Sequence, residues 1–166
     1  YHSLSSMLVA PQGKRNALGI YAGLPWFFQF WPRDEALALK ALSLLSEEAA
    51  LHLLWKELNE ISYDGAIKGS ADAAGWMLAR ARSFVEKKQC EKNQISTLKT
   101  HACKTIEQVL KYHTKQDLAI HNEKETWMDS IDRHVSAIEI QALRLQLYNL
   151  AFLLSASSQE KKKYNT

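Results

Sequence analysis

Glycine and proline, the residues that most often mark turns, number only nine in this chain of 166 residues. Folds built from many short strands need such residues at their hairpins, so this scarcity argues against a sandwich or a β-barrel. Long stretches of the chain instead repeat apolar residues with the period of an α-helix. We therefore expect an all-α fold.

The apolar pattern predicts five helices and a polar tail. The first opens at Trp31-Pro32-Arg33-Asp34, because proline suits the first helical turn and acidic residues suit the positive end of the helix dipole. Ser70 is the predicted N-cap of the third helix. The expected ranges are about 32–46, 47–61, 70–87, 96–113 and 136–156, with a frayed tail at 157–166.

These five helices alternate in character. The first, third and fifth are rich in Ala and Leu nearly all round, whereas the second and fourth have a single apolar face. The alternation predicts buried inner helices and exposed outer ones in a row of helical hairpins. Aromatic or carboxylate residues precede each inner helix, at 31–34, 70–72 and 127–129. Stacked hairpins would bring these three segments to one rim.

Charge and cysteine usage narrow the class of protein. The chain has 21 Lys and Arg against 18 Asp and Glu, and so small an excess of positive charge does not indicate a nucleic-acid-binding protein. No apolar run approaches the roughly 18 residues of a membrane span. Cys90 and Cys103 form no C-x-x-C pair, and the six histidines lack ligand spacing, so we expect reduced cysteines, a cytoplasmic location and neither metal nor cofactor.

The aromatic segment that ends in Trp31, Arg33 and Asp34 is the first candidate site. A flat apolar ring suits one face of a sugar, a guanidinium offers five fixed donors, and a carboxylate offers acceptors for hydroxyl groups. The alternative interpretation is structural. It makes Arg33 and Asp34 an ion pair that caps a helix, and places the neighbouring Phe27, Phe28 and Phe30 in the core.

Thr126-Trp127-Met128-Asp129 repeats the order of aromatic residue then carboxylate. Beside Trp127, a partly desolvated Asp129 would hold its proton more strongly, which makes it the first candidate for a general acid. Asp72 and Glu139 are secondary candidates. For Asp72 the favoured interpretation is a charge at a helix N-terminus, and Glu139 is an acid placed among apolar residues.

At these residues the sequence resembles a family, the C-terminal amylo-α-1,6-glucosidase domain of glycogen-debranching enzymes. Four segments occur in the family's order: Ala22-Gly-Leu-Pro-Trp-Phe with Trp31-Pro-Arg-Asp, Ser70-Ala-Asp-Ala-Ala-Gly-Trp, Thr126-Trp-Met-Asp and Ile138-Glu-Ile-Gln-Ala-Leu. The second segment follows Asp64-Gly65 without the aromatic insertion usual in the family. The W-x-R-D element is also similar to glucoamylase relatives.

The resemblance implies an (α/α)6 barrel of twelve helices and hydrolysis with inversion at the mouth of the inner helices. By the same resemblance, Trp31, Arg33, Asp34, Asp72, Trp127 and Glu139 would bind the terminal glucose of an α-glucan such as glycogen, starch or dextrin, and Asp129 would be the acid. Five helices would be the first half of such a barrel, and the catalytic base would lie beyond Thr166. We therefore expect residues 1–166 to be part of a glycosidase that needs the remainder of its barrel for activity.

Two alternatives stay open at this point. One is a glucoamylase-like enzyme with α-1,4 specificity. The other is a non-catalytic α-glucan-binding helical module that keeps the Trp-Arg-Asp group and has no base. We expect neither a nucleic-acid partner nor a membrane for any of the three.

Overall fold

The computed structural model describes residues 6–9, 18–128, 130–131, 133 and 135–165. The class is all-α, as the sequence predicts, with two short antiparallel hairpins in addition. The elements are β1 (Leu8–Val9), β2 (Gly19–Ile20), α2 (Pro32–Leu45), α3 (Glu47–Asn59), α4 (Ala73–Glu86), α5 (Lys92–Tyr112), β3 (Thr114–Lys115), β4 (Leu118–Ala119), α6 (Ile138–Leu154) and α7 (Ser158–Lys162). β1 pairs with β2, and β3 pairs with β4.

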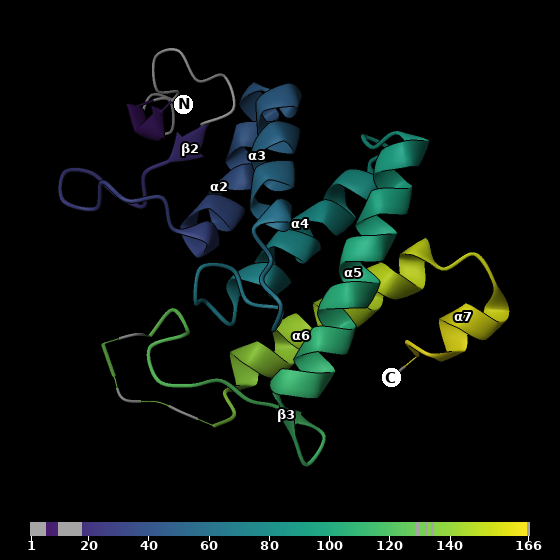
Figure 1. Ribbon diagram of the computed structural model, residues 1–166. Helices are drawn as coiled ribbons and strands as arrows, with labels where there is room; N and C mark the ends of the chain where they lie inside the picture. Colours follow the sequence, from purple (N-terminus) through teal and green to yellow (C-terminus); the bar gives the residue numbers. More distant parts are fainter. Residues whose placement is uncertain (1–5, 10–17, 129, 132, 134, 166) are drawn as a thin grey trace.

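The long helices form two layers (Figure 1). One layer is the row α2, α4 and α6, in which α4 packs against both of its neighbours. The other consists of α3, which packs on α2 and α4, and α5, which packs mainly on α6. The predicted first, third and fifth helices thus form one row and the amphipathic helices cover it.

The core lies between these layers. Its largest fully buried side chains are leucines, with one methionine and two isoleucines: Leu39, Leu42, Leu53, Leu54, Leu58, Leu78, Leu98, Leu150, Met77, Ile20 and Ile67. Gly75 brings α4 close to α6, because a Cβ atom at Gly75 would lie 2.7 Å from the Cβ of Leu143.

The row α2, α4 and α6 is not buried on every side. Leu37 and Leu44 on α2 are exposed, as are Ile138, Leu145 and Phe152 on α6. The expectation of inner helices buried nearly all round is therefore met only on the sides that face the other described helices.

Helix ends differ from the sequence prediction where side chains cap them. α5 begins at Lys92 rather than Ser96, because Glu91 and Gln94 form a capping box. Ser70 is not the N-cap of α4. That position belongs to Asp72, and the Ser70 hydroxyl donates a hydrogen bond to Asp72 instead.

The polar tail is also more ordered than predicted. Residues Ser158–Lys162 form α7, whose N-cap Ser157 accepts a hydrogen bond from the backbone N–H of Glu160. The Lys99 ammonium lies 2.9 Å from a Glu160 carboxylate oxygen, and the Cys103 thiol lies 3.3 Å from the Tyr164 hydroxyl. Contacts with α5 therefore order a polar segment in which the sequence shows no apolar pattern.

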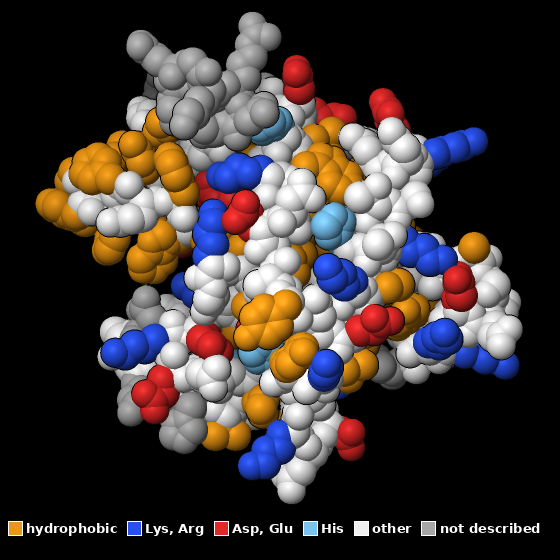
Figure 2. Space-filling view, in the orientation of Figure 1, with side chains coloured by type: hydrophobic (Ala, Val, Ile, Leu, Met, Phe, Trp, Pro, Cys, Tyr) orange, Lys and Arg blue, Asp and Glu red, His pale blue; other side chains and the backbone are white. Residues whose placement is uncertain are grey.

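Apolar side chains gather on the segment between β2 and α2, which projects at the left of the molecule (Figure 2). Trp26, Phe27 and Phe28 are exposed there. Phe30 is half-buried, and its ring stacks on Tyr21 with centroids 5.1 Å apart. The interpretation of Phe27 and Phe28 as core residues is therefore wrong, whereas Phe30 fits it in part.

Within the described part of the chain, none of the helices has the length and apolar character needed to cross a bilayer. Cys90 and Cys103 are both free thiols.

Candidate functional site

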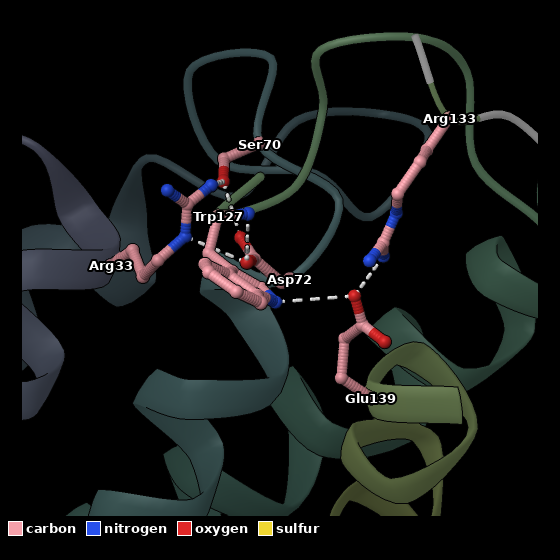
Figure 3. Close-up of polar contacts among 6 residues, drawn as sticks. All are labelled: Arg33, Ser70, Asp72, Trp127, Arg133 and Glu139. Atoms are coloured by element: carbon pink, nitrogen blue, oxygen red, sulfur yellow. Dashed lines mark hydrogen bonds and ion pairs between the residues drawn. The ribbon is translucent and has the colours of Figure 1, made fainter. Parts of the chain in front are cut away.

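The three segments predicted to share a rim do meet (Figure 3). Arg33 at the start of α2, Ser70 and Asp72 ahead of α4, and Trp127 ahead of α6 are joined by hydrogen bonds, although up to 94 positions separate them in sequence. The backbone adds a further link, because the Ala71 N–H donates to the Glu125 carbonyl at 2.8 Å. The convergence of these segments is therefore confirmed.

Asp72 is the centre of this rim network. Its side chain is fully buried. One carboxylate oxygen accepts from the Ser70 hydroxyl at 2.6 Å, and the other accepts from Arg33 Nε at 2.6 Å and from the Trp127 backbone N–H at 3.1 Å. Both oxygens are engaged and neither faces solvent. Asp72 thus holds three segments together and positions Arg33, and its contact with a substrate stays a prediction.

Arg33 pairs with Asp72 rather than with its sequence neighbour Asp34. Consecutive helical residues point in different directions, so an i, i+1 pair cannot face each other. The second contact of the guanidinium is with the Ser70 hydroxyl, at 3.3 Å. These contacts hold the Arg33 side chain in place, and only 13% of it is exposed.

Asp34 is a half-buried carboxyl group beside this network. Burial raises the pKa of Asp34 above its usual value, against the positive charge of Arg33, which lowers it. A carboxyl group in this state keeps its proton to higher pH than an exposed aspartate. It can accept from, or donate to, the hydroxyl groups of a bound molecule.

Glu139, in the first turn of α6, forms the other half of the rim. Its Oε1 accepts a hydrogen bond from the Trp127 indole at 3.2 Å and forms an ion pair with Arg133. Partial burial alone would raise the pKa of Glu139, but its own backbone N–H, Arg133 and the Trp127 indole together hold that pKa below its usual value. Glu139 therefore stays ionised and acts as an acceptor.

Arg133 is a rim residue that the sequence analysis missed. A signal for it exists, because an acid among apolar residues needs a cationic partner, and Arg133 lies six positions before Glu139. What the sequence does not show is that the intervening segment turns back toward the start of α6.

Two tryptophans expose part of their rings at the rim. Trp127 is 53% exposed and Trp31 is 38% exposed. The Trp31 ring contacts Phe27 edge-on, with centroids 6.5 Å apart. These are the flat apolar surfaces expected from the sequence beside Arg33 and Glu139.

A cavity of about 430 Å³ opens next to Trp31. Cavities of this size accommodate small-molecule ligands. Three segments line it, at residues 29–33, 68–70 and 124. Lys68 and Lys124 contribute cations that the sequence analysis did not single out.

The predicted general acid, Asp129, lies outside the described residues. Its role therefore stays a prediction. Its neighbour Trp127 is described and is at the rim, 3.2 Å from Glu139 through the indole nitrogen.

A second group of carboxylates is buried away from the rim, between α2, α3 and β2. Glu35 accepts from the Ile20 backbone N–H at 3.0 Å, and Lys56 lies 3.6 Å from Glu35 and 3.0 Å from Glu57. Burial raises the pKa of Glu35 to about 7, and the negative charge of Glu57 acts in the same direction. This group fastens β2 to the helices, because Lys56 also donates to the Leu18 carbonyl.

No family model, no curated protein and no solved structure matches this chain. Within the described residues, no group of three or more His, Cys, Asp or Glu side chains is placed to hold a metal ion. The rim thus contains two aromatic rings, the guanidinium of Arg33, the ionised carboxylate of Glu139 and the Asp34 carboxyl group with its raised pKa. Groups of these types are the ones that suit a polar, hydroxyl-rich molecule with an apolar face.

Proposed function

We propose that this chain is part of a glycoside hydrolase of the glycogen-debranching type, which hydrolyses α-1,6-linked glucosyl branches with inversion. The observation that carries the proposal is the meeting of Arg33, Asp72, Trp127 and Glu139 at one end of α2, α4 and α6. The four sequence segments that resemble the debranching family are the segments that contribute these residues. The proposed fold is an (α/α)6 barrel to which these helices contribute the first half.

In this proposal each rim residue has a defined role toward the terminal glucose. The rings of Trp31 and Trp127 lie against the apolar faces of the sugar. Arg33 donates to hydroxyl groups from a position that Asp72 fixes, while Asp34 and Glu139 accept from them. A buried, charge-assisted network of this kind keeps its geometry when the ligand arrives.

The proposed chemistry divides between Asp129 and a base elsewhere in the barrel. Asp129 gives its proton to the glycosidic oxygen as the C1–O bond breaks, and the base removes a proton from the water that attacks C1 from the opposite face. Inversion requires the two carboxyl groups to be about 6.5 to 9.5 Å apart. Among the described rim residues no second carboxylate is free for the base, because Asp72 is buried, Glu139 is paired with Arg133 and Asp34 is assigned to hydroxyl groups.

The substrate site is tested by Asp34→Asn in the longer enzyme that the proposal describes. Loss of a charged acceptor should weaken a glucose-like inhibitor by about 1.5 to 3 kcal/mol, measured by calorimetry. Asp117→Asn is the matched control, because Asp117 lies in the exposed β3–β4 turn at a φ of 63°, which Asn tolerates. Unchanged affinity in the folded Asp34 variant would reject the assignment.

The mechanism is tested by Asp129→Asn in the same enzyme. The variant should lose most of kcat and keep its affinity for sugar, and the wild type should release β-glucose from α-linked ends. The 166-residue chain alone should release none, because it lacks the base. Release of glucose from a branched dextrin by the isolated chain at the rate of the whole enzyme would contradict these roles.

A non-catalytic α-glucan-binding module is the second candidate, and one observation favours it. Most of the described charged groups of the rim form ion pairs with each other, namely Arg33 with Asp72 and Arg133 with Glu139. A binding module would show glucan affinity in the isolated chain and no hydrolysis in any longer form. A glucoamylase-like enzyme would instead cleave maltose faster than isomaltose. All three proposals place the protein in the cytoplasm, where free thiols such as Cys90 and Cys103 are stable.

A further inference from the structure

The cavity beside Trp31 has a charge pattern that a neutral sugar does not require. Its charged lining residues are Arg33, Lys68 and Lys124, and the described lining contains no carboxylate. These cations come from the start of α2, the turn before α4 and the segment before α6. Three segments far apart in sequence therefore each contribute a cationic residue to the lining of one cavity of about 430 Å³.

Two of these three cations form ion pairs with carboxylates of the protein. Asp72, which pairs with Arg33, is fully buried, and so is Glu57, which lies 3.3 Å from Lys68. Glu57 also lies 3.0 Å from Lys56, which in turn lies 3.6 Å from Glu35. The Lys68 side chain is 39% exposed despite this ion pair.

Lys124 reaches the cavity from a different direction. It lies in the turn between His121 and Thr126, at a φ of 62°. Glu125, its neighbour in sequence, is engaged with Asn122 through both carboxylate oxygens. Lys124 is exposed and lies between two acids in sequence, Glu123 and Glu125, but neither acid lines the cavity.

The remaining walls suit a sugar ring. Phe30 and Trp31 provide aromatic surface, and Ser70 and Gln29 provide polar groups. An aromatic wall with several cations at its edge matches a hexose that carries an anionic substituent. A phosphate monoester has nearly two negative charges and three acceptor oxygens, which is the number of cations available here.

We propose that this cavity binds a hexose that carries a phosphate monoester, with Arg33, Lys68 and Lys124 around the phosphate. The sugar-binding half of this inference rests on the proposed glucan site. The phosphate-binding half stands on the cavity and its cations alone. The phosphorylated hexose is either a free sugar phosphate or a phosphorylated residue of a glucan chain.

Calorimetry on the 166-residue chain tests the proposal with four probes: glucose 6-phosphate, glucose, inorganic phosphate and a maltooligosaccharide with one phosphorylated residue. Glucose 6-phosphate should bind at least about tenfold more tightly than glucose, the factor supplied by one charge-assisted contact. The difference should shrink as salt is added. If the phosphorylated oligosaccharide binds more tightly than glucose 6-phosphate, the ligand is a glucan. The reverse order identifies a free sugar phosphate.

Lys124→Gln and Lys68→Gln should each remove a large part of the preference for glucose 6-phosphate over glucose. Lys88→Gln is the matched control, because Lys88 is exposed, also has a left-handed φ of 58° and lies in the connection between α4 and α5. Circular dichroism checks that each variant is folded. Lys124 forms none of the ion pairs found in the described residues, so its replacement leaves those pairs intact.

The outcomes separate this inference from the proposed function. Equally tight binding of glucose and glucose 6-phosphate would overturn the inference and leave the sugar site standing. Equal binding of inorganic phosphate and glucose 6-phosphate would show that the hexose is not recognised and would overturn the inference, whereas the proposed function is tested separately in the longer enzyme. Absence of binding by every phosphorylated probe would also overturn the inference.

Discussion

At the scale of single residues, the rim depends on one buried charge. Asp72 is fully buried and accepts hydrogen bonds from Arg33, Ser70 and the backbone of Trp127. A buried carboxylate is tolerated only when such partners replace water. Removing its charge therefore affects both the stability of the fold and the position of Arg33.

Asp72→Asn should destabilise the protein by about 3 kcal/mol, the scale expected when one partner of a buried ion pair is lost. Arg33 would keep its charge, at 13% exposure, without a carboxylate beside it. Urea denaturation measures the free energy of unfolding, and Asp117→Asn serves as the exposed control. Arg33→Met combined with Asp72→Asn should be less harmful than Asp72→Asn alone. A loss below about 1 kcal/mol in the single variant would show that the pair is not a structural requirement.

Glu35 makes the free energy of unfolding depend on pH in the direction opposite to that of an acid whose pKa is lowered in the folded protein. Its pKa is about 7 in the folded protein, against an ordinary value of 4.5, because burial disfavours its charge. The stabilisation from its protonated form is complete below pH 4.5 and is lost as the pH rises to about 7. The groups that face it are Glu57, which raises the pKa, and Lys56 and the Ile20 N–H, which lower it.

Glu35→Gln mimics the protonated side chain at every pH. The stability of the wild type relative to this variant should therefore fall between pH 4.5 and pH 7 and become constant above that range. Urea unfolding at a series of pH values measures the difference. Glu60→Gln, at an exposed position, should show no such change. A pH-independent difference for Glu35→Gln would mean that Glu35 is ionised in the folded protein.

At the scale of elements, the sequence predicts most of what packing and periodicity control. The helices from residues 32, 47 and 73 were expected within a few positions, because their apolar residues repeat with the helical period. Ser70 failed as an N-cap because its hydroxyl is used by Asp72, a contact set by the tertiary fold. α7 was missed for the same reason, since its partners lie on α5, about 60 residues away.

In the candidate site, too, local sequence patterns could be predicted and contacts set by the tertiary fold could not. The meeting of the segments at Trp31, Asp72 and Trp127 was predicted, because hairpins bring the starts of alternate helices to one end. The pairing of Arg33 with Asp72 rather than Asp34 was not, because nothing in the local sequence favours a partner 39 positions away. Lys68 and Lys124 were missed because their turns carry no pattern, and only the folded chain places them at one cavity.

Gly75 controls the contact between α4 and α6. A Cβ atom there would meet the Leu143 Cβ at 2.7 Å, so Gly75→Ala should overpack this interface. We expect a loss of about 1 to 3 kcal/mol, although alanine is the better helix former by about 1 kcal/mol. Thermal or urea unfolding measures it. Leu143→Gly in the same chain removes the Cβ atom that an alanine at position 75 would meet, so the double variant should lose less than the sum of the single losses. Greater stability in Gly75→Ala would show that the two helices can move apart.

At the scale of the whole molecule, the two layers leave one side of their helices open. α6 is apolar nearly all round, yet α4 and α5 cover only part of it. A helix of this composition is normally surrounded by protein. The proposed barrel accounts for the open side, because further hairpins would pack there, and the chain on its own would expose that side to water.

The exposed stripe of α6 should make the isolated chain associate with itself. Ile138, Leu145 and Phe152 follow one another at intervals of seven residues and are 82%, 48% and 39% exposed. Contiguous apolar surface of this kind drives association in water. Sedimentation velocity over a range of concentrations should show reversible oligomers. Leu145→Glu should shift the distribution toward monomer, because association would then bury a charge, whereas Gln146→Glu adds the same charge one position away from the stripe and should change little. A wild-type chain that stays monomeric at every concentration and unfolds cooperatively would show that this surface needs no partner, and that the chain is a finished domain rather than part of a larger barrel.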